Sequence, residues 1–216
     1  MSIYWNSSEI SEIYYGENIS EVYFGSDLVW SACKYEPGQI IVNQASAGNY
    51  TWKCLSNGIF EIVCVGGGSG YAYSEMVWSG AILTGNAKGG SGGGFSIQAK
   101  LKKGTAYSYS VGAGGAYAYA YGAGVTGNPG TKSTFAHLTA NPGNAAHAAY
   151  NGSTDGTGGT QATLTDSETL TIQTINWNKA GIQGGNSILD PYGKGGQVRD
   201  AAGNAGYVKI TFLSKS

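Results

Sequence analysis

The stretch FEIVCVGGGSG, residues 60–70, combines two features that could support nucleotide chemistry. Apolar residues alternate along a strand-like run, and the run then ends in glycine. A glycine-rich loop after a strand can hold a phosphate with its backbone N–H groups. The segment GKGGQV, residues 193–198, is a second glycine-rich candidate.

Neither segment completes a phosphate-binding motif. GGGSGY has no Lys-Ser or Lys-Thr end, and Gly195 follows Lys194 in the second segment. A phosphate loop also needs a helix whose N-terminus faces the anion, and no helical period follows either segment. The sequence therefore favours glycine as an architectural residue and predicts no cofactor.

Histidines and carboxylates are the other residues that could do chemistry. His137 and His147 are ten residues apart, without an HExxH pattern or an acidic partner at a useful spacing. A Ser-His-Asp triad assembles in space and leaves no fixed spacing, but no GxSxG motif is present. A carboxylate pair could hydrolyse a glycosidic bond. The candidates for it all lie in turn-like settings typical of solvated residues: Asp155, Asp166, Glu168, Asp190 and Asp200. We therefore predict no catalytic residue, no metal ligand and no enzyme.

Aromatic residues offer non-covalent chemistry instead. GYAYSEMVW places Tyr71, Tyr73 and Trp78 together, where they interrupt a glycine segment as a loop would. Rings with a polar tip can stack on sugars or anchor a protein interface. The alternative is that these rings fill volume that glycine leaves empty.

A second aromatic segment, GAYAYAYGAG, sets Tyr117, Tyr119 and Tyr121 at strict alternation. In an extended chain these three rings project to one side and the alanines to the other. They too could bind a receptor or pack over a glycine layer. The segment NAAHAAYNGSTDGTGG, residues 144–159, is a further candidate loop and carries His147 and Tyr150.

Composition limits the classes of function. Of 216 residues 37 are glycine, yet 41% are hydrophobic and 16 are tyrosine, which argues for compact structure against disorder. Twelve basic and 13 acidic residues, without runs of either sign, give no basic face for nucleic acid. The N-terminal residues lack the pattern of a signal peptide, and no apolar stretch has the length to insert in a membrane.

The three cysteines have no metal-ligand spacing. Cys64 alternates with apolar neighbours and is expected to be a small buried residue. A disulfide between Cys33 and Cys54 is compatible with the sequence but has no support from it.

The N-terminus repeats. The units IYWNSSEI (3–10), SEIYYGENI (11–19) and SEVYFGSDL (20–28) align, and each is long enough for one strand and one turn. Because so short a unit cannot bury its apolar face alone, we expect the copies to stack or to bind a partner. Residues 1–36 are thus interpreted as a β-repeat stem or connector.

The rest of the chain, residues 37–216, reads as all-β, a sandwich or jelly-roll-like scaffold. Its strand-like runs are 39–44, 49–55, 58–66, 94–101, 106–114, 159–177 and 206–213. Between them lie glycine runs, which can form extended helices like polyproline II that hydrogen-bond to one another. Such rods need a scaffold because ordering glycine costs more entropy than ordering other residues.

Four segments in this order resemble the glycine-rich domain of bacteriophage and prophage tail fibre and receptor-binding proteins: GIFEIVCVGGGSG, AKGGSGGGFSIQAKLKKGTAYSYSVGAGG, GTKSTFAHLTANPGN and YGKGGQVRDAAGNAGYVKITF. The N-terminal units are similar to I-Y-x-G repeats in minor structural proteins of phages that infect Gram-positive hosts. The resemblance implies polyglycine rods on a β-scaffold, loops at one end that touch the bacterial surface, and a homo-oligomer, with a trimer as the first expectation. The glycine runs here are shorter than in the most glycine-dense members, and the insert 151–181 departs from the pattern.

Together these observations predict a virion or tail-associated adhesin, free of membrane insertion and of nucleic acid, that binds a bacterial surface glycan or protein through several copies. It would be located on the virion or outside the cell after lysis, with other tail proteins bound through the N-terminal repeats. Two alternatives stay open: a purely structural assembly module, and a tail-associated enzyme that degrades glycan.

Overall fold

The computed structural model describes residues 3–5, 8–10, 21–24, 27–31 and 34–215. The chain divides into two compact units, residues 1–34 and 35–216. The described residues contain strands, turns and bends, without helix. None of them therefore forms a helical segment with the length and apolar character of a membrane span.

The first unit contains two antiparallel strand pairs. Strand β1 (Ile3–Trp5) pairs with β2 (Ser8–Ile10), and β3 (Glu21–Phe24) pairs with β4 (Asp27–Ser31). The first repeat unit thus contains two short strands rather than the single strand expected, because eight residues suffice for two strands of three. The second repeat unit, residues 11–19, and Cys33 lie outside the described residues.

Two antiparallel sheets form a sandwich in the second unit. The five-stranded sheet has the order β17-β10-β7-β18-β5, and the four-stranded sheet has the order β15-β14-β11-β6. The strands of the first sheet are β5 (Ile40–Gln44), β7 (Gly58–Val65), β10 (Gly94–Leu101), β17 (Leu170–Lys179) and β18 (Tyr207–Ser214). Those of the second are β6 (Gly48–Lys53), β11 (Ala106–Val111), β14 (Ser133–Phe135) and β15 (Leu138–Ala140). The predicted all-β sandwich is confirmed.

Alternating side chains build the core between the two sheets. Phe60, Ile62 and Cys64 of β7 are fully buried, as their spacing in a strand requires. Phe60 meets Phe212 edge to face at 5.2 Å, and Tyr107 stacks on Phe135 at 5.5 Å. Burial raises the pKa of the Cys64 thiol far above its usual range, so this cysteine acts as the small buried residue that was predicted.

The Thr-rich stretch 159–177 was predicted as strand along its whole length, but β17 begins only at Leu170. Gly159 instead packs its backbone against Asn141 and Pro142, and Gly158 against Gly181. Close backbone contact, which glycine alone permits, therefore replaces strand pairing at the start of this stretch.

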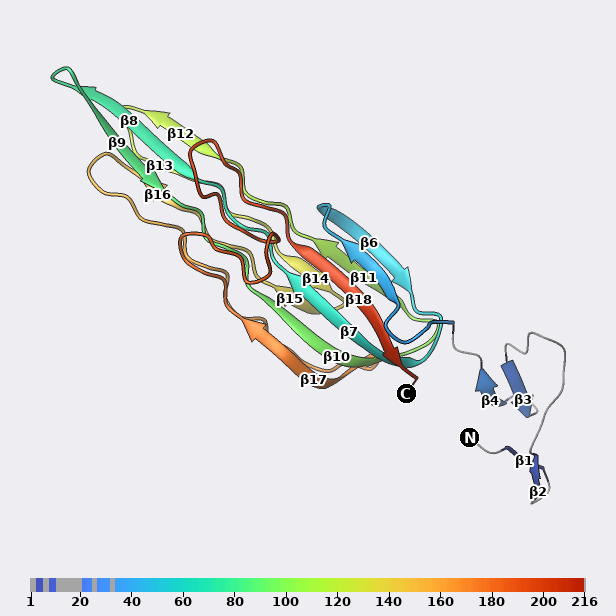
Figure 1. Cartoon of the computed structure of the whole chain (residues 1–216). Helices are drawn as coiled ribbons and strands as arrows, with labels where there is room; N and C mark the ends of the chain where they lie inside the picture. Colours follow the sequence, from blue (N-terminus) through green and yellow to red (C-terminus); the bar gives the residue numbers. More distant parts are fainter. Residues whose placement is uncertain (1–2, 6–7, 11–20, 25–26, 32–33, 216) are drawn as a thin grey trace. The chain divides into compact units, whose positions relative to one another are not determined.

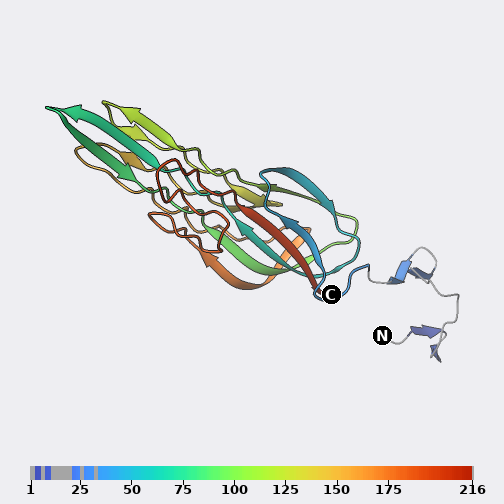
Figure 2. The ribbon, with the colours of Figure 1, turned by 45° about the horizontal axis from the view of Figure 1, so that its top comes forward.

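A bundle of extended glycine-rich segments continues from the sandwich. In Figures 1 and 2 these segments run side by side between the sandwich and the β8–β9 hairpin. Residues 66–71, which follow β7, lie at its centre and are buried throughout. Their six successive N–H groups donate in turn to three neighbouring segments: Gly66 to Gly93, Gly67 to Thr131, Gly68 to Asn204, Ser69 to Gly90, Gly70 to Asn128 and Tyr71 to Ala201.

Each neighbouring segment accepts from two central residues that are three positions apart. Its residue number falls as that of the central residue rises, so the three neighbours run antiparallel to the central segment. A three-residue repeat is the period of the polyproline II helix. The central carbonyls accept from three further segments, through the N–H groups of Gly115, Gly143 and Gly196. The central segment is therefore a polyglycine II rod that hydrogen-bonds to six neighbours.

The close approach of these backbones accounts for the glycines. A Cβ atom on Gly68 would collide with the carbonyl oxygen of Lys194, and one on Gly92 would collide with that of Gly66. In the outer segments, several glycines that face a neighbouring backbone lie three residues apart. A Cβ atom on Gly127 or Gly130 would meet Gly70 or Gly67 of the central rod, and one on Gly112 or Gly115 would meet Thr131 or Asn128 of another outer segment. Gly156 and Gly159 lie in the same way against Asn144 and Asn141, while Gly114 and Gly158 depart from this spacing and face Gly203 and Gly181.

The role of these contacts predicts that Gly92→Ala lowers the free energy of unfolding by about 3 kcal/mol or more, because two rods would have to separate. Gly124→Ala is the matched control, since the nearest atom to its new Cβ is a side-chain atom of His147 at 3.2 Å. The control is expected to cost less than about 1 kcal/mol. Denaturant unfolding measures both, and equal effects would contradict the rod packing.

Candidate functional site

The second unit ends in a small two-layered tip. Strands β8 (Ala72–Trp78) and β9 (Ala81–Ala87) form a hairpin, and β12 (Ala118–Tyr121) pairs in parallel with β8. The second layer is the pair β13 (Val125–Thr126) and β16 (His147–Ala148). Figure 1 shows the hairpin at the end of this unit that lies away from the C-terminus.

Small residues fill the space between the two layers. Ala72, Ala87, Ala146 and Ala148 are fully buried or nearly so, and Val125 packs against them. Because side chains alternate along a strand, the residues next to Ala72 in β8 must face outward. The segment 72–78 was interpreted as a loop, so its strand structure corrects that interpretation.

The outward face of the tip is rich in tyrosine. Tyr119 is the parallel partner of Tyr73, and Tyr121 is the partner of Glu75, so all four side chains share one side of the sheet. Tyr119 is 46% exposed and Tyr121 is 61% exposed. We call this surface, together with Arg199, the tyrosine face.

Hydrogen bonds and ring contacts order the tyrosine face. Tyr119 donates its hydroxyl proton to Glu75 at 2.7 Å, and Tyr73 donates to the other carboxylate oxygen at 3.2 Å. The rings of Tyr73 and Tyr119 stack at 6.0 Å, and the Arg199 guanidinium lies 4.2 Å from the centre of the Tyr73 ring. The face thus offers fixed rings, hydroxyl groups and one charge of each sign.

These contacts also set the ionisation of the face. The hydrogen bond from Tyr119, together with that from Tyr73 and the charge of Arg199, lowers the pKa of Glu75. The same hydrogen bond raises the pKa of Tyr119. Glu75 therefore remains an anionic hydrogen-bond acceptor at neutral pH, and Tyr119 remains a donor.

Tyr117 is half-buried at the edge of the face. Burial and the neighbouring Asp200 raise its pKa, while a hydrogen bond with Arg199 opposes the rise. Both expected roles of the alternating tyrosines are thus seen: Tyr117 packs, whereas Tyr119 and Tyr121 are presented to solvent.

The other predicted binding residues lie elsewhere. Trp78 is 66% exposed but alternates with Val77, so it points to the opposite side of the hairpin from the tyrosine face. His147 is exposed on the second layer, where its Nδ1 lies 3.1 Å from Thr126 Oγ1, and Tyr150 is exposed in the following loop. Tyr71 is buried at the end of the central rod, so for this ring the structure matches the alternative in which it fills volume.

Three of the residues considered for catalysis have partners in the backbone of the chain. Asp155 accepts from the Lys88 N–H and Asp166 from the Ile172 N–H, both at 2.8 Å. His137 Nε2 lies 2.8 Å from the Thr165 carbonyl oxygen. Within the described part of the chain, no three His, Cys, Asp or Glu side chains gather as metal ligands.

The glycine segment after β7, which was considered as a phosphate-binding loop, also has structural partners. All N–H groups from Gly66 to Gly70 donate to other segments of the chain. None of them therefore remains to bind a phosphate, and the prediction of an architectural role for this glycine run is confirmed.

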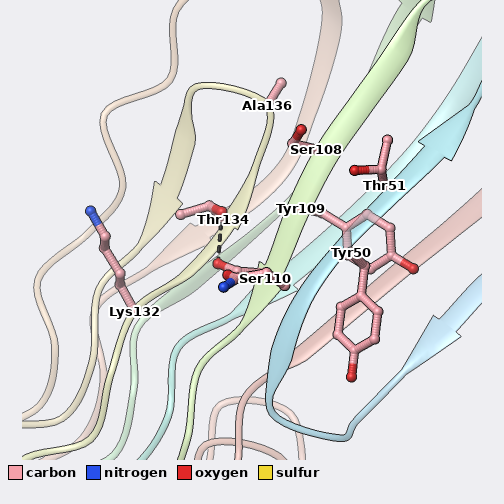
Figure 3. A pocket seen from close by; sticks show the side chains of 9 residues that line it. Tyr50, Thr51, Ser108, Tyr109, Ser110, Lys132, Thr134 and Ala136 are labelled. Carbon is pink, nitrogen blue, oxygen red and sulfur yellow. Dashed lines mark hydrogen bonds between the residues drawn. The ribbon is translucent and has the colours of Figure 1, made fainter.

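A hollow of about 550 Å³ lies on the outer face of the four-stranded sheet. Figure 3 shows its small hydroxyl side chains, with Ser110 and Thr134 hydrogen-bonded at 2.8 Å, and Lys132 set apart from them. Tyr50 and the buried Tyr109 alternate along their strands with these hydroxyl residues, and their rings stack with centres 5.2 Å apart. The hollow presents hydroxyl groups and one cation but no converging acid–base pair.

Sequence reasoning missed several residues of the tip. Glu75 and Arg199 are separated by more than a hundred residues, and only the fold brings them to Tyr73. Val77 and Ile82 are paired across the hairpin and are 52% and 70% exposed. Residues 72–78 give only a weak hydrophobic alternation, and no local pattern marks Arg199.

The fold and the tip define an all-β module that presents an exposed aromatic surface on a bundle of glycine rods. The family model described as a glycine-rich domain matches residues 44–211, from the end of β5 into β18. The chain therefore belongs to this glycine-rich domain family. Comparison with curated proteins gives no significant match.

The hydrogen bonds of Glu75 give a testable pH dependence. Tyr119→Phe removes the strongest contribution, so the pKa of Glu75 should rise toward its ordinary value near 4.5. Because the pKa is lowered in the folded state, the contribution of Glu75 to stability is present above that ordinary value and is lost as the pH falls through the lowered one. A ¹³C NMR titration of the carboxyl group measures the shift. Tyr121→Phe is the control, and equal pKa values in both variants would contradict the assignment.

Proposed function

We propose that this chain is a non-enzymatic, receptor-binding part of a phage or prophage tail, and that its tyrosine face binds glycan on the bacterial surface. The observation that carries the proposal is the group of exposed, ordered rings around Glu75 at the tip. Tyrosine rings stack on the apolar faces of sugars, while hydroxyl groups, a carboxylate and a guanidinium bind sugar hydroxyls.

The rod bundle supports this proposal because it holds the strand that carries the rings in a fixed position. Recognition by a few rings is strongest when the rings lose little freedom on binding. Hydrogen bonds from Tyr73 and Tyr119 to Glu75 hold two rings in place, and β8 continues directly from the central rod. A site with three rings has modest affinity by itself, so we further propose a homo-oligomer, a trimer in the first instance, that gains avidity from several tips.

A second candidate function has its own support. The end of the β8–β9 hairpin exposes the cross-strand partners Val77 and Ile82 on one side and Trp78 on the other. Exposed apolar side chains in a group are typical of a protein contact. In this case the tip would bind another virion protein, and the chain would be a structural assembly module, with residues 1–36 as a connector.

Binding to whole cells tests the first proposal. The fluorescently labelled chain is incubated with a panel of Gram-positive bacteria and with their purified wall polysaccharides. We expect strain-selective binding that the double variant Tyr119→Ser/Tyr121→Ser reduces about tenfold or more, because each lost stacking contact contributes about 0.5–1.5 kcal/mol beyond its buried area.

Two control variants separate the candidates. Tyr150→Ser removes an exposed tyrosine outside the face and should leave binding unchanged. Trp78→Ser removes the ring on the other side of the hairpin. If binding survives the double variant but is lost in either control, the glycan site is not the tyrosine face. If no strain or polysaccharide binds the folded protein, the assembly function is favoured.

A further inference from the structure

A second cleft lies on the outer face of the five-stranded sheet. It has a volume of about 280 Å³ and is lined by Trp177, Tyr192, Tyr207, Glu61, Lys209 and Ser96, with two apolar side chains beside them. Its size is near the lower limit of about 300 Å³ for small-molecule pockets. It therefore suits a single ring-sized group rather than an extended ligand.

The aromatic walls of this cleft are fixed. Tyr192 stacks on Tyr207 with ring centres 4.0 Å apart and planes 5° apart. The Tyr207 hydroxyl donates to the Asn43 side chain at 2.6 Å, which anchors the stack to β5. Trp177 is half-buried in β17, directly opposite Ser96 of β10. The Trp177 side chain thus borders a pocket whose shape is held by neighbouring strands.

The polar side of the cleft is equally well ordered. Lys209 and Glu61 form an ion pair at 3.3 Å, and both side chains are between a quarter and a third exposed. Ser96, which is buried, donates its hydroxyl proton to Glu61 at 3.3 Å, and the Asn176 amide donates to Ser96 at 3.0 Å. The carboxylate is oriented by these partners, while the exposed part of the pair can still accept and donate hydrogen bonds.

We propose that this cleft binds one uncharged hexopyranose unit. The apolar face of the sugar would stack on Trp177, and adjacent hydroxyls would donate to Glu61 and accept from Lys209. The two charges cancel, so the cleft carries no net charge that would favour an anionic or a cationic ligand. Glu61 is the one carboxylate among the residues described as lining the cleft, so the proposed role is binding and not hydrolysis by a carboxylate pair.

This inference does not rest on the tyrosine face, because the two surfaces share no residue and the cleft belongs to the sandwich. A chain with both sites would contact a polysaccharide at two places. Such a chain could remain bound through the sandwich while the tip exchanges between receptors.

NMR of the full chain with ¹⁵N-labelled tryptophan tests the cleft, with Trp177→Phe to assign the indole signal. The probes are the methyl glycosides of glucose, galactose, mannose and N-acetylglucosamine, each titrated separately. We expect at least one of them to shift the Trp177 indole signal saturably and to leave the Trp78 signal in place. Glu61→Gln, which keeps the shape of the side chain, should weaken that binding about tenfold or more.

The variants make each outcome decisive. Tyr119→Ser/Tyr121→Ser should bind the glycoside as the unchanged chain does, which separates the cleft from the tip. Trp177→Ala should abolish binding, which for this variant is read from the signals of the glycoside itself, while the other indole signals show an intact fold. If no glycoside shifts the Trp177 signal, or if Trp177→Ala or Glu61→Gln binds equally well, the cleft proposal is overturned, whatever the result of the cell-binding experiment.

Discussion

The architecture of the second unit depends on hydrogen bonds between backbones that approach without intervening side chains. Buried N–H and C=O groups must find partners, and sheets usually provide them. In the rod bundle the six N–H groups of the central segment 66–71 donate to three neighbours, and the carbonyls of Gly67, Gly68 and Ser69 accept from three more. A Cβ atom is excluded at Gly66, Gly67, Gly68 and Gly70, since that space is filled by carbonyl oxygens of neighbouring segments. Ser69 is the exception in this rod, and its buried hydroxyl group hydrogen-bonds to Asn144 of a neighbouring segment. The glycine content is therefore a consequence of backbone packing and not of flexibility.

The sandwich offsets the conformational entropy that is lost when the glycine rods become ordered. Ordering a glycine costs more than ordering any other residue, and a bundle of short rods contributes little apolar burial to offset it. Two of the rods, however, are continuous with strands of the sandwich. The central rod 66–71 follows β7, and the rod 88–93 precedes β10. The aromatic core around Phe60, Tyr107 and Phe212 fixes the strands of the sandwich from which the rods continue. The rods begin in register because the strands do.

Much of this fold can be read from the sequence, since alternation in residues 58–65 and 94–101 defines strands whose inward residues are apolar. The rods were harder to specify. Their signature is not an overall G-X-Y repeat but glycine at every third position over six residues, as at 112 and 115 or 127 and 130, beside two segments that are almost pure glycine and serine. The hairpin 72–87 was missed because its inner face is built from alanine, serine and glycine, which give a weak hydrophobic pattern. The tyrosine face needs Arg199 from a loop far along the chain, and only the three-dimensional packing supplies it.

The tip follows from the same constraint. Its core contains four alanines and a valine, too little apolar area to hold five strands by burial alone. The rods instead fix the position of the hairpin, since β8 continues the central rod 66–71 and β9 leads into the rod 88–93. Side chains on the outward surface, such as Tyr119, Tyr121 and Ile82, therefore do not carry the stability of the fold. A surface held by the backbone beneath it can change its side chains while the bundle that presents it stays the same.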